Sequence, residues 1–237
     1  MANASQLGGT SGTFNFNPSA SSLILHAFSR CGIRGPQVQA QHILDARNAL
    51  NFIQADWAND QVNLWTVELI TVPLVYGQAQ YAVPSNVILI LDAYLERNAG
   101  SAVPIDTYMY PISRTEWAAY PDKVSPGTPT VYWFDRLLSP NVTIWQPPVN
   151  ATWTFNYYAC RQIQDVSVAN AGQVEIPYAY LKALSDALSV ELAIMYAPER
   201  VAMLQPIAAQ SYARAKEMGS ERAPLYFTPG LSGYYRT

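Results

Sequence analysis

Apolar residues recur at steps of three and four near both ends of the chain, and this spacing predicts amphipathic helices. Two helices are expected in the first quarter, over residues 17–32 and about 37–58. Two more are expected near the other end, over residues 177–197 and 198–219, with proline at each start and glycine after the last turn. The apolar positions of these helices supply an expected helical core: Leu23, Phe28, Leu50, Ile53, Trp57, Leu184, Leu188 and Leu192.

The middle of the chain changes to a period of two, which indicates strands. The expected strands cover residues 64–74, 87–97, 103–109, 130–136, 141–148 and 152–163. A hairpin-like turn is expected around Gly77, and Ser113 and Glu116 have the spacing of a capping box that begins a short helix. Turns every 8–12 residues favour an antiparallel sandwich or a small barrel.

This order of elements predicts an α+β protein with an inserted domain. One-sided apolar helices must bury their apolar faces, so we expect a four-helix cluster built from both chain ends, with the first two helices as antiparallel neighbours. The expected parts are an extended N-terminal arm (1–17) with Phe14 and Phe16 as anchors, a helical domain (18–60 and 176–219), an inserted β domain (61–175) and an extended C-terminal tail (220–237).

Composition bears on what the surface of the protein contacts. Half of the 237 residues are hydrophobic and only 13% are charged, about half the usual share, while the chain holds 16 Tyr, 6 Trp and 7 Phe. Such a surface is expected to face other protein, although a tyrosine-rich β protein explains the same numbers. The net charge of −3 and the absence of a basic patch argue against a protein that grips nucleic acid.

Cysteine and histidine are scarce. Cys31 and Cys160 form no CxxC pair, and His26 and His42 do not complete a zinc pattern, so we expect no metal and no cofactor. The sequence leaves a disulfide between the two cysteines as an alternative, but it favours two free, buried thiols. No run approaches a membrane span, and the N-terminus lacks the pattern of a signal peptide, so a reducing cytoplasm is the expected location.

The sequence holds no constellation of catalytic residues. It has no GxSxG, HExxH, GxxxxGKS or GxGxxG motif. Either histidine could act as a base, but each is more often a packed or surface helix residue. A cation site needs more ligands than the two carboxylates of Asp56 and Asp60. The pair Asp135-Arg136 is most simply a surface charge pair. Cys31 has no neighbour that would activate its thiol. The sequence therefore favours a protein that is not an enzyme.

The C-terminal tail combines aromatic residues with helix breakers. It is too apolar for a solvated tail and too rich in proline and glycine for a helix. We expect it to dock on a partner through Leu225, Tyr226, Phe227, Pro229, Leu231, Tyr234, Tyr235 and Arg236.

Tryptophans on the expected strands support an alternative function. Trp133, Trp145 and Trp153 could form an aromatic platform that stacks sugars, so a β-sandwich module for glycans or another surface partner is the second hypothesis. Tryptophan in a β domain is more often part of the core.

The first third of the chain resembles the head-to-tail connector proteins of tailed phages. A first helix with "AFSRCGI" (27–33), a second with "ARNALNFIQADW" (46–57) and a "GQAQY" turn (77–81) are similar to the adaptor of short-tailed phages, the class with packaged-DNA stabilisation proteins and tail tubular protein A. The resemblance covers roughly residues 19–90.

The resemblance implies a structural role in the neck or tail of a virion, with assembly in the host cytoplasm. Such adaptors form a ring of about twelve copies under the portal protein. The ring extends the DNA channel, with DNA as passing cargo, and receives the tail nozzle and in some cases tail fibres. The C-terminal segment of such adaptors often climbs onto the portal.

Overall fold

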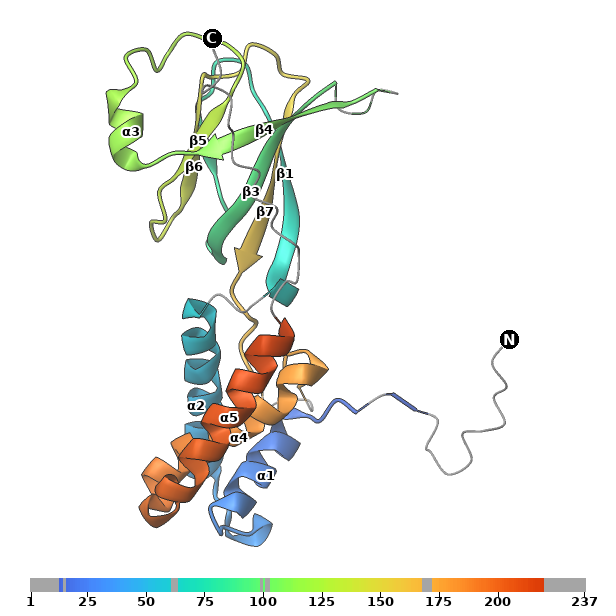
Figure 1. The fold of residues 1–237 in the computed structure, drawn as a ribbon, viewed down its shortest axis with the longest axis vertical. Helices are drawn as coiled ribbons and strands as arrows, with labels where there is room; N and C mark the ends of the chain where they lie inside the picture. The colour runs from blue at the N-terminus through green and yellow to red at the C-terminus, as the bar shows by residue number, and fades with distance from the viewer. Residues whose placement is uncertain are drawn as a thin grey trace, which may run out of the picture.

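The computed structural model describes residues 13–14, 16–60, 64–98, 100, 103–167 and 172–219. A helical lobe and a β lobe lie end to end (Figure 1). The helical lobe contains α1 (Ala20–Arg30), α2 (Ala40–Asn59), α4 (Tyr178–Tyr196) and α5 (Val201–Gly219). The chain is therefore α+β, with N- and C-terminal helices packed together around an insertion, as predicted.

The first helix begins at Ala20, three residues after the predicted start. Ser19 is its N-cap, and the Ser19 side chain accepts a hydrogen bond from the backbone N–H of Ser22 at 3.2 Å. The backbone N–H of Ala20 also donates to the Gly172 carbonyl at 2.9 Å, which fixes the start of α1 beside the loop before α4. Gly32 has a φ of +87°, a conformation that favours glycine and ends the helix.

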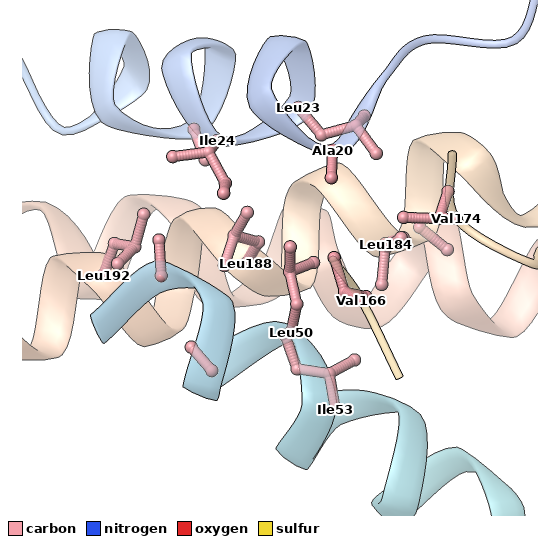
Figure 2. Close-up of a cluster of buried hydrophobic side chains, with 14 of the residues drawn as sticks. Ala20, Leu23, Ile24, Leu50, Ile53, Val166, Val174, Leu184, Leu188 and Leu192 are labelled. Atoms are coloured by element: carbon pink, nitrogen blue, oxygen red, sulfur yellow. The ribbon is translucent and has the colours of Figure 1, made fainter. Parts of the chain in front are cut away.

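Helix α4 is the centre of the helical lobe. It contacts α1, α2 and α5, and Figure 2 shows the side chains of α1 and α2 converging on it from opposite sides. The eight side chains expected in the helical core all lie in one buried cluster. Helices α1 and α2 contact each other through Phe28 and His42, but each packs more extensively against α4, because both bury their apolar faces there.

The β lobe is one curled seven-stranded sheet, a half-barrel rather than a sandwich. Its strands are β1 (Val67–Pro73), β2 (Gln80–Ala82), β3 (Val87–Arg97), β4 (Ile105–Pro111), β5 (Val131–Phe134), β6 (Asn141–Trp145) and β7 (Thr154–Arg161). They pair in the order β1-β7-β3-β4-β5-β6-β2. The inner face carries a second buried cluster that includes Leu95, Tyr132, Phe155 and Tyr157.

Two details of the sheet differ from the prediction. First, β4 and β5 pair in parallel, because α3 (Arg114–Ala119) and its loop carry the chain back between them. Second, the turn at Gly77 does not join a hairpin, since β1 pairs with β7 and β2 pairs with β6. Residues 74–79 instead cross from one edge strand to the other. The seven Cα–Cα steps from Pro73 to Gln80 span at most about 25 Å, whereas a flat sheet of seven strands is about 29 Å wide, so the crossing requires the curl.

The two lobes are joined where β1 begins and β7 ends. Val67 and Cys160 are direct partners in the sheet, so the two ends of the insertion lie side by side. Trp65 Nε1 donates to the Glu175 carbonyl at 3.0 Å, and Arg161 pairs with the Glu175 carboxylate. In the helical lobe, the Asn51 side chain accepts from the backbone N–H of Val166 at 2.9 Å.

The central position of α4 gives a stability prediction. Leu188 is fully buried, so Leu188→Ala is expected to lower the free energy of unfolding by about 2–5 kcal/mol. Ile194→Ala on the same helix is the matched control, because Ile194 is 56% exposed and should change stability little. Urea unfolding followed by circular dichroism measures both, and equal effects would contradict the assignment of α4 as the core helix.

Candidate functional site

A buried carboxylate, Asp186, links helices of the helical lobe. Its side chain is 2% exposed and pairs with Arg30 of α1 and, at 2.7 Å, with Lys182 one turn earlier on α4. Arg30 also donates to Ser189 Oγ at 3.4 Å. Burying a charge is costly unless it is paired, so these contacts fix how α1 lies against α4.

The environment of Asp186 keeps it ionised. Burial raises the pKa of the carboxyl, but hydrogen bonds from Lys182, Ser211 and Arg30 and the charge of Arg30 outweigh burial. The pKa of Asp186 therefore lies below its ordinary value of 3.8. Because Arg30 belongs to α1, the carboxylate connects α1 to α4.

His26 lies beside a serine but does not complete a catalytic triad. His26 Nδ1 is 2.9 Å from Ser185 Oγ. A triad needs a carboxylate that orients the histidine. The neighbouring Asp186 is instead held by Arg30 and Lys182.

The other residues considered for chemistry have structural partners. His42 accepts the backbone N–H of Gln39 at 3.0 Å, at the start of α2, and packs edge-on against Tyr196. Neither cysteine forms a disulfide, and burial raises the pKa of the Cys31 thiol, which disfavours the reactive thiolate. Cys31 is buried as expected, whereas Cys160 is only half-buried.

Asp60 and Asp135 also have structural partners. Asp60 accepts a hydrogen bond from the Tyr212 hydroxyl at 2.6 Å and lies 3.5 Å from Lys216, so it ties the end of α2 to α5. Asp135 accepts the backbone N–H of Asn141 at 2.8 Å in the turn between β5 and β6. Within the described ranges, no group of three or more His, Cys, Asp or Glu side chains is placed to hold a metal ion.

The three tryptophans of the β lobe do not form an open platform. Trp153 belongs to the buried cluster of the sheet. Trp133 stacks on Trp117 of α3, with ring centroids 6.4 Å apart. Trp145 packs against Tyr120, just after α3, and its Nε1 donates to the Asp122 carbonyl at 2.6 Å. The α3 segment therefore covers the face on which sugar stacking was expected.

Two hollows on the helical lobe are both lined in part by α4. A pocket of about 530 Å³ between α1 and α4 is lined by Phe16, Leu23, Tyr178 and Leu181 and reaches Asp186. A groove of about 390 Å³ lies between α2 and α5; we call it the α2–α5 groove. Its lining comprises Phe52, Ile53, Asp56, Trp57, Ala187, Val190, Glu191, Gln205, Ala208 and Ala209.

The sequence did not single out these apolar surfaces. Phe52 is 75% exposed and Met203 is 57% exposed, although both lie on helices that bury other apolar residues. Met195, which follows the buried Leu188 and Leu192 at helical spacing on α4, is 47% exposed. The sequence signal for these surfaces was that each helix carries apolar residues outside the apolar stripe that faces the core.

The expected docking residues of the tail lie outside the described residues. What the structure gives is the place where the tail begins. Helix α5 ends at Gly219, so close to Tyr180 that a Cβ atom at Gly219 would collide with the Tyr180 hydroxyl. The tail therefore starts beside the first turn of α4.

Comparison with protein families decides the general identity. The family model of the SU10 adaptor protein matches residues 24–229, which include all helices from α2 onward and the whole sheet. The chain belongs to the SU10 adaptor protein family. Its members are head-to-tail adaptors of phages, which agrees with the resemblance seen in the sequence. A search of curated proteins finds no match to the chain.

Membership of the SU10 adaptor family explains the character of the surface. The protein is a structural component of a phage virion and an adaptor that binds other virion proteins, and the family is not one of enzymes. In the part of the chain that the structure describes, no helix is long and apolar enough to cross a membrane.

The buried carboxylate of this adaptor gives a testable pH dependence. Asp186→Asn removes the carboxylate that pairs with Arg30 and should cost on the order of 3 kcal/mol of stability at neutral pH. Because the folded pKa of Asp186 is lowered, its contribution is present above pH 3.8 and is lost as the pH falls through the folded pKa. The wild type should therefore lose more stability than the variant on acidification.

Urea unfolding at neutral pH and below pH 4 measures this difference. Glu191→Gln on the exposed side of α4 is the matched control, since it removes an acidic charge without burial. A parallel loss of stability in wild type and Asp186→Asn would show that the carboxylate is not the acid-sensitive group.

Proposed function

We propose that this adaptor assembles as a ring of about twelve copies beneath the portal of a short-tailed phage. The ring extends the DNA channel, and it offers a platform for the tail nozzle, with tail fibres as a further partner. The helical lobes form the ring wall and the β lobe receives the next tail component.

One observation carries the ring: the helical lobe exposes large apolar side chains on several helices. Phe52 is 75% exposed, Met203 57% and Ile194 56%. Obligate interfaces are more apolar than ordinary surface, and contiguous exposed apolar patches mark interaction sites. A subunit with neighbours on both sides would bury these residues.

The charge of the protein supports a passive DNA channel. The net charge is −3 and charged residues make up 13% of the chain. A lumen that attracted phosphates would hold DNA rather than let it pass. A mildly acidic chain is therefore suited to line a conduit.

The C-terminal tail is the proposed portal contact. It begins at the first turn of α4, beside Gly219, and carries the aromatic anchors Tyr226, Phe227, Tyr234 and Tyr235. An aromatic side chain that buries about 150 Å² contributes on the order of 4 kcal/mol before the cost of ordering the tail. Repetition around the ring would make the joint durable by avidity.

Electron microscopy of the purified protein, alone and mixed with its portal, tests the ring. We expect rings of about twelve copies seated coaxially on the portal. Monomers that stay monomeric in the presence of portal rings would contradict the proposal.

Deletion of residues 224–237 tests the role of the tail. The shortened chain should unfold at the same urea concentration as the wild type, because the deletion leaves both buried clusters intact. It should lose most of its binding in a portal pull-down. Glu221→Gln, which leaves the aromatic anchors in place, is the control, and unchanged portal binding by the shortened chain would rule out this role.

A further inference from the structure

The segment before α1 presents aromatic side chains that the described part of the chain leaves mostly exposed. Phe14 is 100% exposed and Phe16 is 70% exposed; Phe16 meets the edge of the Tyr178 ring, with centroids 6.5 Å apart. Figure 1 shows this segment leading away from the helical lobe. Two exposed phenylalanines so close in sequence need a partner surface.

The α2–α5 groove is a receptor of matching chemistry. Trp57 and Ile53 are buried beneath it, and Phe52 stands exposed at its edge. The α5 side is unusually apolar for a surface helix, because residues 201–213 carry no charged side chain. Only Leu204 and Ala215 of α5 are fully buried, so much of this helix faces outward.

Charge also favours an uncharged occupant for this groove. Its charged lining residues are the acidic Asp56 and Glu191. An acidic segment would be repelled there. The segment 13–18 contains no charged residue, so phenylalanine rings flanked by threonine, asparagine and proline can enter without burying a charge.

The arm and the groove lie on different sides of the molecule. The arm leaves beside the pocket that contains Lys182, whereas Ala187 lies in the α2–α5 groove. These residues are five positions apart on α4, so they point about 140° apart at ~100° per residue. A protruding element on one side and a receptor on nearly the opposite side is the arrangement that a head-to-tail contact between identical subunits requires.

We propose that Phe14 and Phe16 of one copy seat in the α2–α5 groove of the next copy around the ring. This inference rests on the proposed ring and assigns its subunit contact. It makes the N-terminal arm a clasp between neighbours and leaves the C-terminal tail for the portal.

Engineered disulfide cross-linking tests the contact with both phenylalanines in place. The variant Thr13→Cys with Gln205→Cys puts one thiol next to the arm anchors and one in the groove. Under mild oxidation of the assembled protein, we expect a ladder of covalent oligomers on a denaturing gel. Thr13→Cys with Val124→Cys is the control, because Val124 is 81% exposed but lies in the β lobe. The wild type, with Cys31 and Cys160, gives the background.

A second variant separates the anchors from the rest of the arm. Adding Phe14→Ser and Phe16→Ser to the Thr13 and Gln205 cysteines should lower the ladder yield about tenfold. Asn17→Ser, a change at an exposed polar position of the same arm, should leave it unchanged. Equal ladders from the two variants would contradict the anchor role.

Electron microscopy of the same samples distinguishes the failure of this inference from the failure of the ring. Rings without an arm-to-groove ladder would overturn the clasp and leave the ring standing. Absence of both rings and ladder would overturn both. A ladder from Tyr226→Cys with Gln205→Cys, in place of the arm ladder, would assign the groove to the C-terminal tail and refute the proposal.

Discussion

The packing of α4 against α1, α2 and α5 is the interaction on which the rest of the structure depends. Leu184, Leu188 and Leu192 have no exposed surface, and α1 and α2 have little contact without α4. Since α4 follows the whole β lobe in sequence, the N-terminal helices cannot complete their core until the β lobe and α4 have been synthesised. The two parts of the helical lobe therefore form one cooperative unit.

Within that apolar packing, polar contacts set the directions of the helices. Asp186 holds Arg30 of α1, and Asp60 at the end of α2 holds Tyr212 of α5. Leucine and alanine contacts tolerate sliding, whereas a charged hydrogen bond has a narrow range of good geometries. The exposed apolar surfaces thus stand on a lobe whose helix positions are fixed, as an adaptor that must match its neighbours requires.

The sequence predicted the local features well and the long-range pairing poorly. The bounds of β3 and the capping box of α3 agree with the structure, because each depends on residues close in sequence. The parallel pairing of β4 with β5 was missed, since period-two alternation does not record which strand lies next to which. Phe52 escaped notice because a helix pattern identifies the buried face and says nothing about a partner of the opposite face. The docking role of the tail residues stays a prediction.

The side-by-side ends of the insertion have a mechanical consequence. Val67 at the start of β1 and Cys160 near the end of β7 are paired, and Trp65 and Arg161 anchor this junction to Glu175. A load on the far end of the β lobe would reach the helical lobe along two adjacent covalent backbones at once. Both strands would be pulled in the same direction, so the hydrogen bonds between β1 and β7, which lie perpendicular to the strands, would carry little shear force. The β lobe can therefore transmit tension from a bound partner while β1 stays paired with β7.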